Sequence, residues 1–158
     1  MRVATFNCNS IRTRLQPVLA WLKQHQPDLL ALQETKVVDE LFPAAAFTEA
    51  GYHVTFRGMK AYNGVALLSR RPPERVRFGL ADDGPADEAR LLHATFGNLH
   101  VINTYVPQGR DIEHPLFAYK QEWYRRLRAY FRRHLKADTP ALWLGDLNVA
   151  AEPIDVYN

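Results

Sequence analysis

Two short segments of this chain are apolar at successive positions, and they restrict the fold more than any other feature. They are Leu29-Leu30-Ala31-Leu32 and Ala141-Leu142-Trp143-Leu144, which have the length of strands. A strand that is apolar at successive positions is covered on both faces of its sheet. The sequence therefore predicts an α/β fold with buried central strands.

Hydrophobic spacing and turn residues predict the other elements. Leu15, Val18, Leu19 and Leu22 recur at helical spacing and predict a helix over Leu15–His25. A short helix is expected near Ala44–Ala50, and a long one over Pro115–Lys136, with Pro115 in its first turn. Strands are expected at Arg2–Asn7, Leu29–Gln33, His53–Arg57, Gly64–Ser69, Val76–Phe78, Leu91–Phe96, Leu99–Val106 and Ala141–Leu144, with a hairpin turn at Gly97-Asn98.

The number of helices leads to an expectation about packing. Two substantial helices cover only one face of a sheet this wide, and the other face needs a layer that the sequence does not contain. We therefore expect that a partner chain supplies this layer, or that the natural protein continues past Asn158.

Composition excludes some classes of protein. The 158 residues suit one domain, and no apolar run is long enough to span a membrane. The N-terminus enters a strand without a signal-peptide core, and Cys8 is the single cysteine, so we expect a cytoplasmic protein without disulfides. The net charge of +3 and the pI near 9.1 permit an anionic partner such as nucleic acid without requiring one.

Polar residues gather where the predicted strands end. They are Asn7, Gln33-Glu34, Tyr105, and Asp146 with Asn148. Side chains at the ends of adjacent strands meet at one rim of a sheet, and carboxylate and amide oxygens suit Mg²⁺. A single acidic residue after a strand is more often a cap or a turn residue. Composition and spacing alone therefore leave both interpretations open.

Five sequence motifs in order carry a family resemblance. They are Thr5-Phe6-Asn7-Cys8-Asn9-Ser10-Ile11-Arg12, Leu32-Gln33-Glu34-Thr35-Lys36, Asn63-Gly64-Val65-Ala66-Leu67-Leu68-Ser69, Tyr105-Val106-Pro107-Gln108-Gly109 and Gly145-Asp146-Leu147-Asn148. Together they resemble the exonuclease III family of abasic-site endonucleases, in the wider endonuclease/exonuclease/phosphatase superfamily. The resemblance covers the whole chain from Met1 to Asn158. Each motif is weak alone, but five in the same order are specific.

The resemblance implies a fold and an activity. The fold is the N-terminal half of a four-layer α/β/β/α sandwich of the DNase I type, with mixed, largely antiparallel sheets. Residues 1–158 would be the N-terminal part of a single domain whose C-terminal half is absent, and the complete protein is expected to be a monomer. The implied activity is Mg²⁺- or Mn²⁺-dependent hydrolysis of duplex DNA, by incision beside abasic sites and 3′–5′ trimming.

The resemblance also implies roles for individual residues. Glu34 matches the metal-binding glutamate, and Asn7 the asparagine that helps to order the metal and its waters. Tyr105 matches a tyrosine at the scissile phosphate, Asp146 the aspartate that positions or deprotonates the attacking water, and Asn148 its companion at the phosphate. Arg90 and Gln108 match DNA-contacting side chains of the family, and the loop with Arg57, Lys60 and Tyr62 matches a family loop that touches DNA. Lys36 is expected at a phosphate for a different reason, which is that its point charge lies next to Glu34.

The chain departs from the family pattern at its histidines. Complete members end in a Ser-Asp-His motif, whereas no histidine here follows an Asp and none lies after Asp146. We expect the six histidines at the surface or at strand flanks: His25, His53, His93, His100, His114 and His134. A second family aspartate is also missing. This chain alone is therefore expected to be weakly active or inactive.

Other interpretations remain open at this stage. One is a superfamily phosphatase or phospholipase that acts on a phosphorylated small molecule or lipid, and another is a non-catalytic DNA-binding module. Cys8 is expected to be a small buried thiol. The basic residues of Pro115–Lys136 are expected to form a solvated face, and the acidic loop Ala81–Ala89 has no assigned role.

Overall fold

The computed structural model describes residues 1–86 and 88–155, and these residues form two four-stranded sheets. The first sheet has the order β1-β2-β4-β3, made of β1 (Val3–Asn7), β2 (Leu29–Gln33), β4 (Val65–Ser69) and β3 (His53–Arg57). The second has the order β5-β6-β7-β8, made of β5 (Arg75–Phe78), β6 (Leu91–Phe96), β7 (Leu99–Tyr105) and β8 (Ala141–Asp146). The helices are α1 (Ile11–His25), α2 (Ala44–Glu49) and α3 (Pro115–His134), with 3₁₀ turns at Asp39–Leu41 and Pro153–Asp155.

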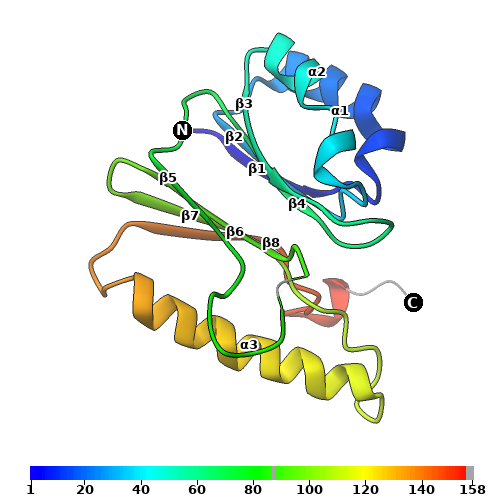
Figure 1. The fold of residues 1–158 in the computed structure, drawn as a ribbon, viewed down its shortest axis with the longest axis vertical. Helices are drawn as coiled ribbons and strands as arrows, with labels where there is room; N and C mark the ends of the chain where they lie inside the picture. Colours follow the sequence, from blue (N-terminus) through cyan, green and yellow to red (C-terminus); the bar gives the residue numbers. More distant parts are fainter. Residues whose placement is uncertain (87, 156–158) are drawn as a thin grey trace.

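The two sheets lie face to face between the helices. Figure 1 shows α1 and α2 on the outer face of the first sheet and α3 on the outer face of the second. This arrangement confirms the predicted α/β/β/α layers. The expectation that one sheet face lacks a covering layer is wrong, because the predicted strands form two sheets and each sheet covers the inner face of the other.

Three apolar layers follow from this arrangement. The middle layer joins the sheets and contains Leu29, Ala31, Val65, Leu67, Leu92, Ala94 and Val101. A second layer packs the first sheet against α1 and α2, and a third packs the second sheet against α3. Strands β2 and β4 are buried at all five positions, as expected for central strands with cover on both faces.

Buried polar side chains also join the two sheets. Asn103 on β7 is fully buried, and its amide nitrogen donates to the carbonyl oxygens of Leu32 (3.0 Å) and Ala66 (2.9 Å) in the first sheet. Its amide oxygen accepts from Nε2 of Gln33 at 2.7 Å. Since buried polar groups are costly unless they are paired, this network favours one register of the sheets.

The strand topology brings several chain segments to one rim. Strands β1 and β2 are parallel and joined through α1, and β7 and β8 are parallel and joined through α3. The other strand pairs are antiparallel, which confirms the prediction of mixed, largely antiparallel sheets. The carboxyl ends of β1, β2, β7 and β8 therefore lie at the same end of the sandwich.

The first helix starts earlier than its apolar spacing predicts. α1 begins at Ile11, which is fully buried, whereas the prediction began at Leu15. The polar residues of its first turn obscure the helical period. Backbone hydrogen bonds from Ser10 to Glu34 (2.8 Å) and from Ile11 to Thr35 (3.1 Å) fix this start beside the end of β2.

Gly145 is required by the close approach of β8 to β7. Its φ is +130°, and a Cβ at this position would lie 2.0 Å from the carbonyl oxygen of Thr104. A side chain here would force β8 away from β7, one residue before Asp146.

Cys8 is buried in the layer beneath α1. Its thiol donates to the carbonyl oxygen of Gln33, with the sulfur 3.3 Å from that oxygen. Burial raises the pKa of the Cys8 thiol to about 12. The prediction of a small buried thiol is confirmed.

We predict that Gly145→Ala lowers the free energy of unfolding by about 3 kcal/mol, because the new Cβ meets the β7 backbone. Gly97→Ala is the matched control, since Gly97 also has a positive φ (+61°) but a Cβ there meets no atom within 4 Å. Its cost should be about 1 kcal/mol. Urea unfolding of the full-length protein measures the free energy of unfolding of both variants. Equal losses of this free energy in Gly145→Ala and Gly97→Ala would contradict the steric explanation.

We also predict that Cys8 resists iodoacetamide in the folded protein at about pH 8, because the protonated thiol is a poor nucleophile. Denaturation in urea should make it react fully. Intact mass measured before and after unfolding reads the modification, and rapid labelling of the folded protein would show that Cys8 is accessible.

Candidate active site

Three predicted site residues meet at the rim formed by both sheets. The side-chain amide nitrogen of Asn7, at the end of β1, donates to Glu34 Oε1 at 2.7 Å and to Asp146 Oδ2 at 2.8 Å. Glu34 follows β2, and Asp146 is the last residue of β8 in the other sheet. One amide group thus joins two carboxylates from different sheets.

Glu34 is held in its charged form. Burial alone would raise the pKa of Glu34, but hydrogen bonds from Asn7, Lys36 and Tyr105 outweigh burial and hold that pKa below its usual value. The ammonium of Lys36 lies 2.8 Å from Glu34 Oε2. The carboxylate is therefore ionised at neutral pH.

Tyr105 is held in its protonated form. Burial, the charge of Glu34 and a hydrogen bond to Glu34 raise the pKa of the Tyr105 phenol to about 12, although the nearby Arg90 opposes this shift. The hydroxyl therefore acts as a hydrogen-bond donor at neutral pH.

The loop after β8 is fixed by contacts with β7 and α3. The backbone N–H of Asn148 donates to Asp146 Oδ1 at 3.0 Å, and the Asn148 amide nitrogen donates to the carbonyl oxygen of Val106 at 2.7 Å. The Tyr124 hydroxyl on α3 donates to the carbonyl oxygen of Leu147 at 2.7 Å, and Lys120 donates to that of Asn148. These contacts hold Asp146 and Asn148 next to Tyr105.

Several site residues have a left-handed backbone. The φ angles are +52° for Glu34, +52° for Lys36 and +49° for Asn148, a region that is uncommon for residues other than glycine. Backbone hydrogen bonds from Thr35 to Gly64 (3.3 Å) and from Lys36 to Asn63 (2.9 Å) support this conformation. Such strain gathers at functional sites, where the surrounding structure maintains it.

The donor set suits a hard divalent cation with few protein ligands. Mg²⁺ takes one or two carboxylates and keeps several waters, and Glu34 and Asp146 offer such oxygens. Within the described ranges, no group of three or more His, Cys, Asp or Glu side chains could hold a metal ion. Asn7 presents its amide nitrogen to the carboxylates, while its Oδ1 accepts from the backbone N–H of Asn9 at 3.0 Å. In this arrangement Asn7 aligns the carboxylates, and its oxygen faces away from them.

The residues expected to contact DNA lie around this rim, and they differ in exposure and in their side-chain contacts. Lys60, Tyr62 and Gln108 are exposed, and Tyr62 has 69% of its surface accessible. Arg57 is exposed at the end of β3, with its guanidinium 4.4 Å from the centre of the Phe78 ring. Lys36 contacts Glu34 and Asn9.

Arg90 is held by Glu88, a residue for which the sequence predicted no functional role. Its Nε lies 2.7 Å from Glu88 Oε2, its guanidinium is 4.9 Å from the centre of the Tyr105 ring, and the Tyr119 hydroxyl donates to the same Glu88 oxygen at 3.0 Å. Glu88 belongs to the acidic loop that had no predicted role. A role for Glu88 could have been suspected from the sequence, because this loop is acidic and the helix Pro115–His134 is basic.

Two other expectations about charged residues need correction. The basic face of α3 is not wholly solvated, because Arg126 pairs with Asp82 at 2.6 Å and its side chain is only 12% exposed. His93 does not lie at the surface or at a strand flank, since it is 3% exposed inside β6. It contacts Tyr130 of α3 at 2.8 Å.

An open pocket of about 620 Å³ lies beside the carboxylates. It runs between the ends of β1 and β8, and its lining includes Asn7, Gln33, Asp146 and Asn148. The site thus adjoins an open space whose volume lies in the range of ligand-binding sites. In the part of the chain that the structure describes, no helix is both long and apolar enough to cross a membrane.

Comparisons with known proteins agree with this geometry. The family model described as "Endonuclease/Exonuclease/phosphatase family" matches residues 4–158. The exodeoxyribonuclease III of Haemophilus influenzae is 36% identical over 99% of this chain, and an exodeoxyribonuclease of Bacillus subtilis is 31% identical over 100%. The chain covers 60% and 62% of the length of these two relatives.

Solved structures show the same similarity. An AP endonuclease from Archaeoglobus fulgidus has a TM-score of 0.94 and 49% identity, and a 3′–5′ exonuclease from Neisseria meningitidis has a TM-score of 0.93 and 37% identity. Each match covers 100% of this chain, and 61% and 62% of the respective relative. The resemblance inferred from the five motifs is confirmed, and the chain belongs to the Endonuclease/Exonuclease/phosphatase family.

Proposed function

We propose that the protein is a Mg²⁺-dependent phosphodiester hydrolase of DNA repair, which incises duplex DNA at abasic sites and trims it from 3′ ends. The observation that carries this proposal is the contact of Asn7 with Glu34 and Asp146, which assembles two carboxylates from two sheets at one rim. The relatives described as exodeoxyribonuclease III, AP endonuclease and 3′–5′ exonuclease support the choice of DNA as substrate.

Glu34, aligned by Asn7, would hold the metal ion. Bound there, Mg²⁺ (or Mn²⁺) supplies a Lewis acid for a phosphoryl oxygen. The lowered pKa of Glu34 keeps this ligand charged at neutral pH. Lys36 offsets part of the negative charge, so that an anionic phosphate can approach the two carboxylates.

Asp146, Tyr105 and Asn148 would act on the water and the phosphate. Asp146 accepts a proton from the attacking water, a contribution of roughly 10²–10⁴-fold for a positioned base. The protonated phenol of Tyr105 donates a hydrogen bond to the phosphate as charge develops in the transition state. Asn148 has a second amide N–H beyond the one that it gives to Val106, and this N–H would serve the same phosphate.

Basic and aromatic side chains around the rim would position the DNA. Arg90, fixed by Glu88 beside Tyr105, is well placed for a backbone phosphate next to the scissile one. The remaining proposed DNA contacts are Lys36, Arg57, Lys60, Tyr62 and Gln108. Because most of these are exposed, they would provide salt-dependent affinity more than sequence preference.

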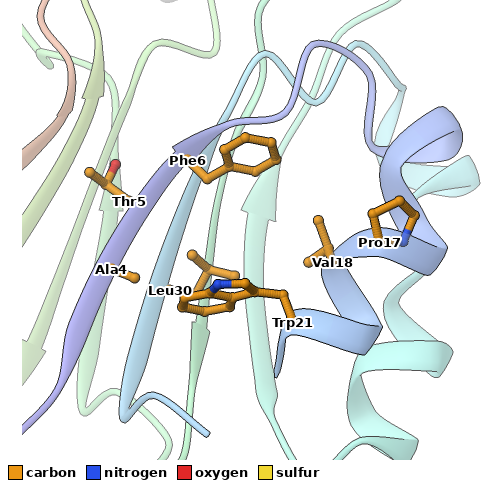
Figure 2. Close-up of a pocket in the computed structure, with 7 residues that line it drawn as sticks. All are labelled: Ala4, Thr5, Phe6, Pro17, Val18, Trp21 and Leu30. Atoms are coloured by element: carbon orange, nitrogen blue, oxygen red, sulfur yellow. The ribbon is translucent and has the colours of Figure 1, made fainter. Parts of the chain in front are cut away.

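We also propose that residues 1–158 are the N-terminal part of a single domain, which is a monomer when complete. An apolar pocket of about 350 Å³ lies between the edge strand β1 and α1, where Phe6 and Trp21 are 44% and 37% exposed (Figure 2). Trp143, on the other edge strand β8, is 39% exposed. Further segments of the domain would cover these edges, and a cytoplasmic location accords with DNA as the substrate.

The first prediction from this proposal concerns Glu34. In the full-length protein, Glu34→Gln should lower the rate of incision of duplex DNA with one abasic site at least about 100-fold, since the neutral amide weakens the cation site. Glu49→Gln, an exposed change on α2, is the matched control and should leave the rate unchanged. EDTA should abolish incision by the unaltered protein.

The same assay separates the alternatives. Binding of abasic DNA by the unaltered protein without incision would favour a non-catalytic DNA-binding module. Hydrolysis of a phosphorylated small molecule or lipid with no action on DNA would favour a phosphatase or phospholipase. A 3′-phosphorylated duplex belongs in the assay, because one structural relative is described as a 3′ phosphatase bound to a product DNA hairpin.

The second prediction separates two roles for Tyr105. Tyr105→Phe should lower the incision rate about 10- to 100-fold and leave the Kd for DNA nearly unchanged, because the phenol donates mainly to charge that develops in the transition state. Since the pKa of Tyr105 is near 12, its ionisation should not set the alkaline limb of the pH–rate profile. A variant whose alkaline limb moves relative to the unaltered protein would show instead that the phenol titrates during catalysis.

A further inference from the structure

A second cluster of ionisable side chains lies on the outer face of the second sheet, under the C-terminal end of α3. In the strand register Arg75 pairs with Thr95 and Thr95 with His100, while Arg77 pairs with His93, so these side chains share one face. They line a pocket of about 190 Å³ together with two residues of α3. The lining residues are Arg75, Arg77, His93, Thr95, His100, Arg133 and His134.

This pocket is separate from the candidate active site. His100 and Tyr105 stand near opposite ends of β7, five residues apart. At a rise of about 3.3 Å per residue, the two positions are about 17 Å apart along the strand. The pocket also faces α3, whereas Tyr105 points toward Glu34 and the first sheet. A ligand in this pocket would not touch the residues proposed for catalysis.

The described residues that line this pocket bring positive charge and include no carboxylate. They are three arginines, which stay charged at any ordinary pH, three histidines and a threonine. Among the described residues, no carboxylate forms an ion pair with Arg75 or Arg77, whereas Arg90, Arg125 and Arg126 each have one. Arg133 donates to the carbonyl oxygen of Leu80 at 2.8 Å, which is a neutral partner.

The histidines form a fixed polar wall. His93 is held on both ring nitrogens, 2.8 Å from the Tyr130 hydroxyl and 2.8 Å from Nδ1 of His100. The His134 ring packs against Tyr130 at a tilt of 50°, with centroids 4.3 Å apart. These contacts keep the imidazoles in place, so a ligand would meet a preformed site and few side chains would need to be ordered.

We propose that this pocket binds a phosphate group, as inorganic phosphate or as the phosphate of a nucleotide or of DNA. Arginine presents several N–H donors in a planar fork that matches phosphate oxygens, and the pocket offers three such groups around a space of suitable size. Thr95 adds a hydroxyl donor. The uncompensated charge of Arg75 and Arg77 is the main source of affinity.

The protonation of the histidines supports this assignment. Burial and the nearby His100, His134 and Arg77 lower the pKa of His93 to about 4, and burial, Arg77 and Arg133 lower that of His134. A bound anion favours the charged imidazolium, so it should raise the pKa of both rings. By linkage, protonation of these rings should tighten the binding of an anion whose own charge stays constant.

The test is calorimetric titration of the full-length protein with inorganic phosphate at constant ionic strength. Saturable binding is expected, and the double variant Arg75→Gln/Arg77→Gln should weaken it at least about 10-fold. Arg128→Gln, an exposed arginine on α3 away from the pocket, is the matched control. Arg77→Lys keeps the charge and should retain most of the binding. A thermal melt of each variant verifies that it is folded.

Nuclear magnetic resonance of the histidine rings gives an independent readout. Phosphate should raise the pKa of His93 and His134 and leave the ring resonances of His53, on β3, unshifted. Competition by a mononucleotide would identify a free phosphomonoester as the natural ligand, and competition by duplex DNA in the Glu34→Gln background would identify the DNA backbone. Absence of saturable binding, or an equal effect of the Arg75/Arg77 and Arg128 changes, would overturn the proposal.

Discussion

The packing of the two sheets against each other is the interaction on which the rest of the structure depends. It buries the apolar inner faces of β2, β4, β6 and β7 and orders Asn103, whose amide bonds two carbonyl groups of the opposite sheet. Without this contact each sheet would carry half of the candidate site. With it, the ends of β1 and β2 meet those of β7 and β8, and Asn7 can reach both Glu34 and Asp146.

The charges at the rim follow from this convergence. Two carboxylates that approach each other would repel, and the N–H groups of Asn7, the ammonium of Lys36 and the phenol of Tyr105 offset the repulsion. The same groups keep Glu34 ionised, whereas burial and the charge of Glu34 keep Tyr105 protonated. Positively charged side chains surround these groups along the rim, and one of them, Arg90, is held in place by Glu88. The site therefore combines a cation-binding centre with surroundings that attract an anionic polymer.

Much of the fold could be predicted from local patterns, and the errors share one physical cause. The strands and helices were predicted nearly at their observed bounds, because apolar periodicity reflects which side of each element is buried. The expectation of an uncovered sheet face failed because periodicity does not say which strands pair. Likewise, the sequence alone placed His93 at the surface and gave the acidic loop no role. Both inferences were made without knowing that α3 packs against His93 and against this loop. Pairing partners such as Tyr130 for His93 are set by packing between distant segments.

The sequence by itself determined the family and the identity of the chemical groups. Five ordered motifs place Asn7, Glu34, Tyr105, Asp146 and Asn148 at the ends of strands or just after them. The polar residues that end a buried strand can be recognised from the sequence alone. Only the tertiary structure decided how these groups meet. It shows that Asn7 offers its nitrogen to two carboxylates, that Lys36 is paired with Glu34, and that three histidines share a pocket with three arginines. Each of these facts depends on residues far apart in the chain, whose proximity is fixed by the packing of sheets and helices.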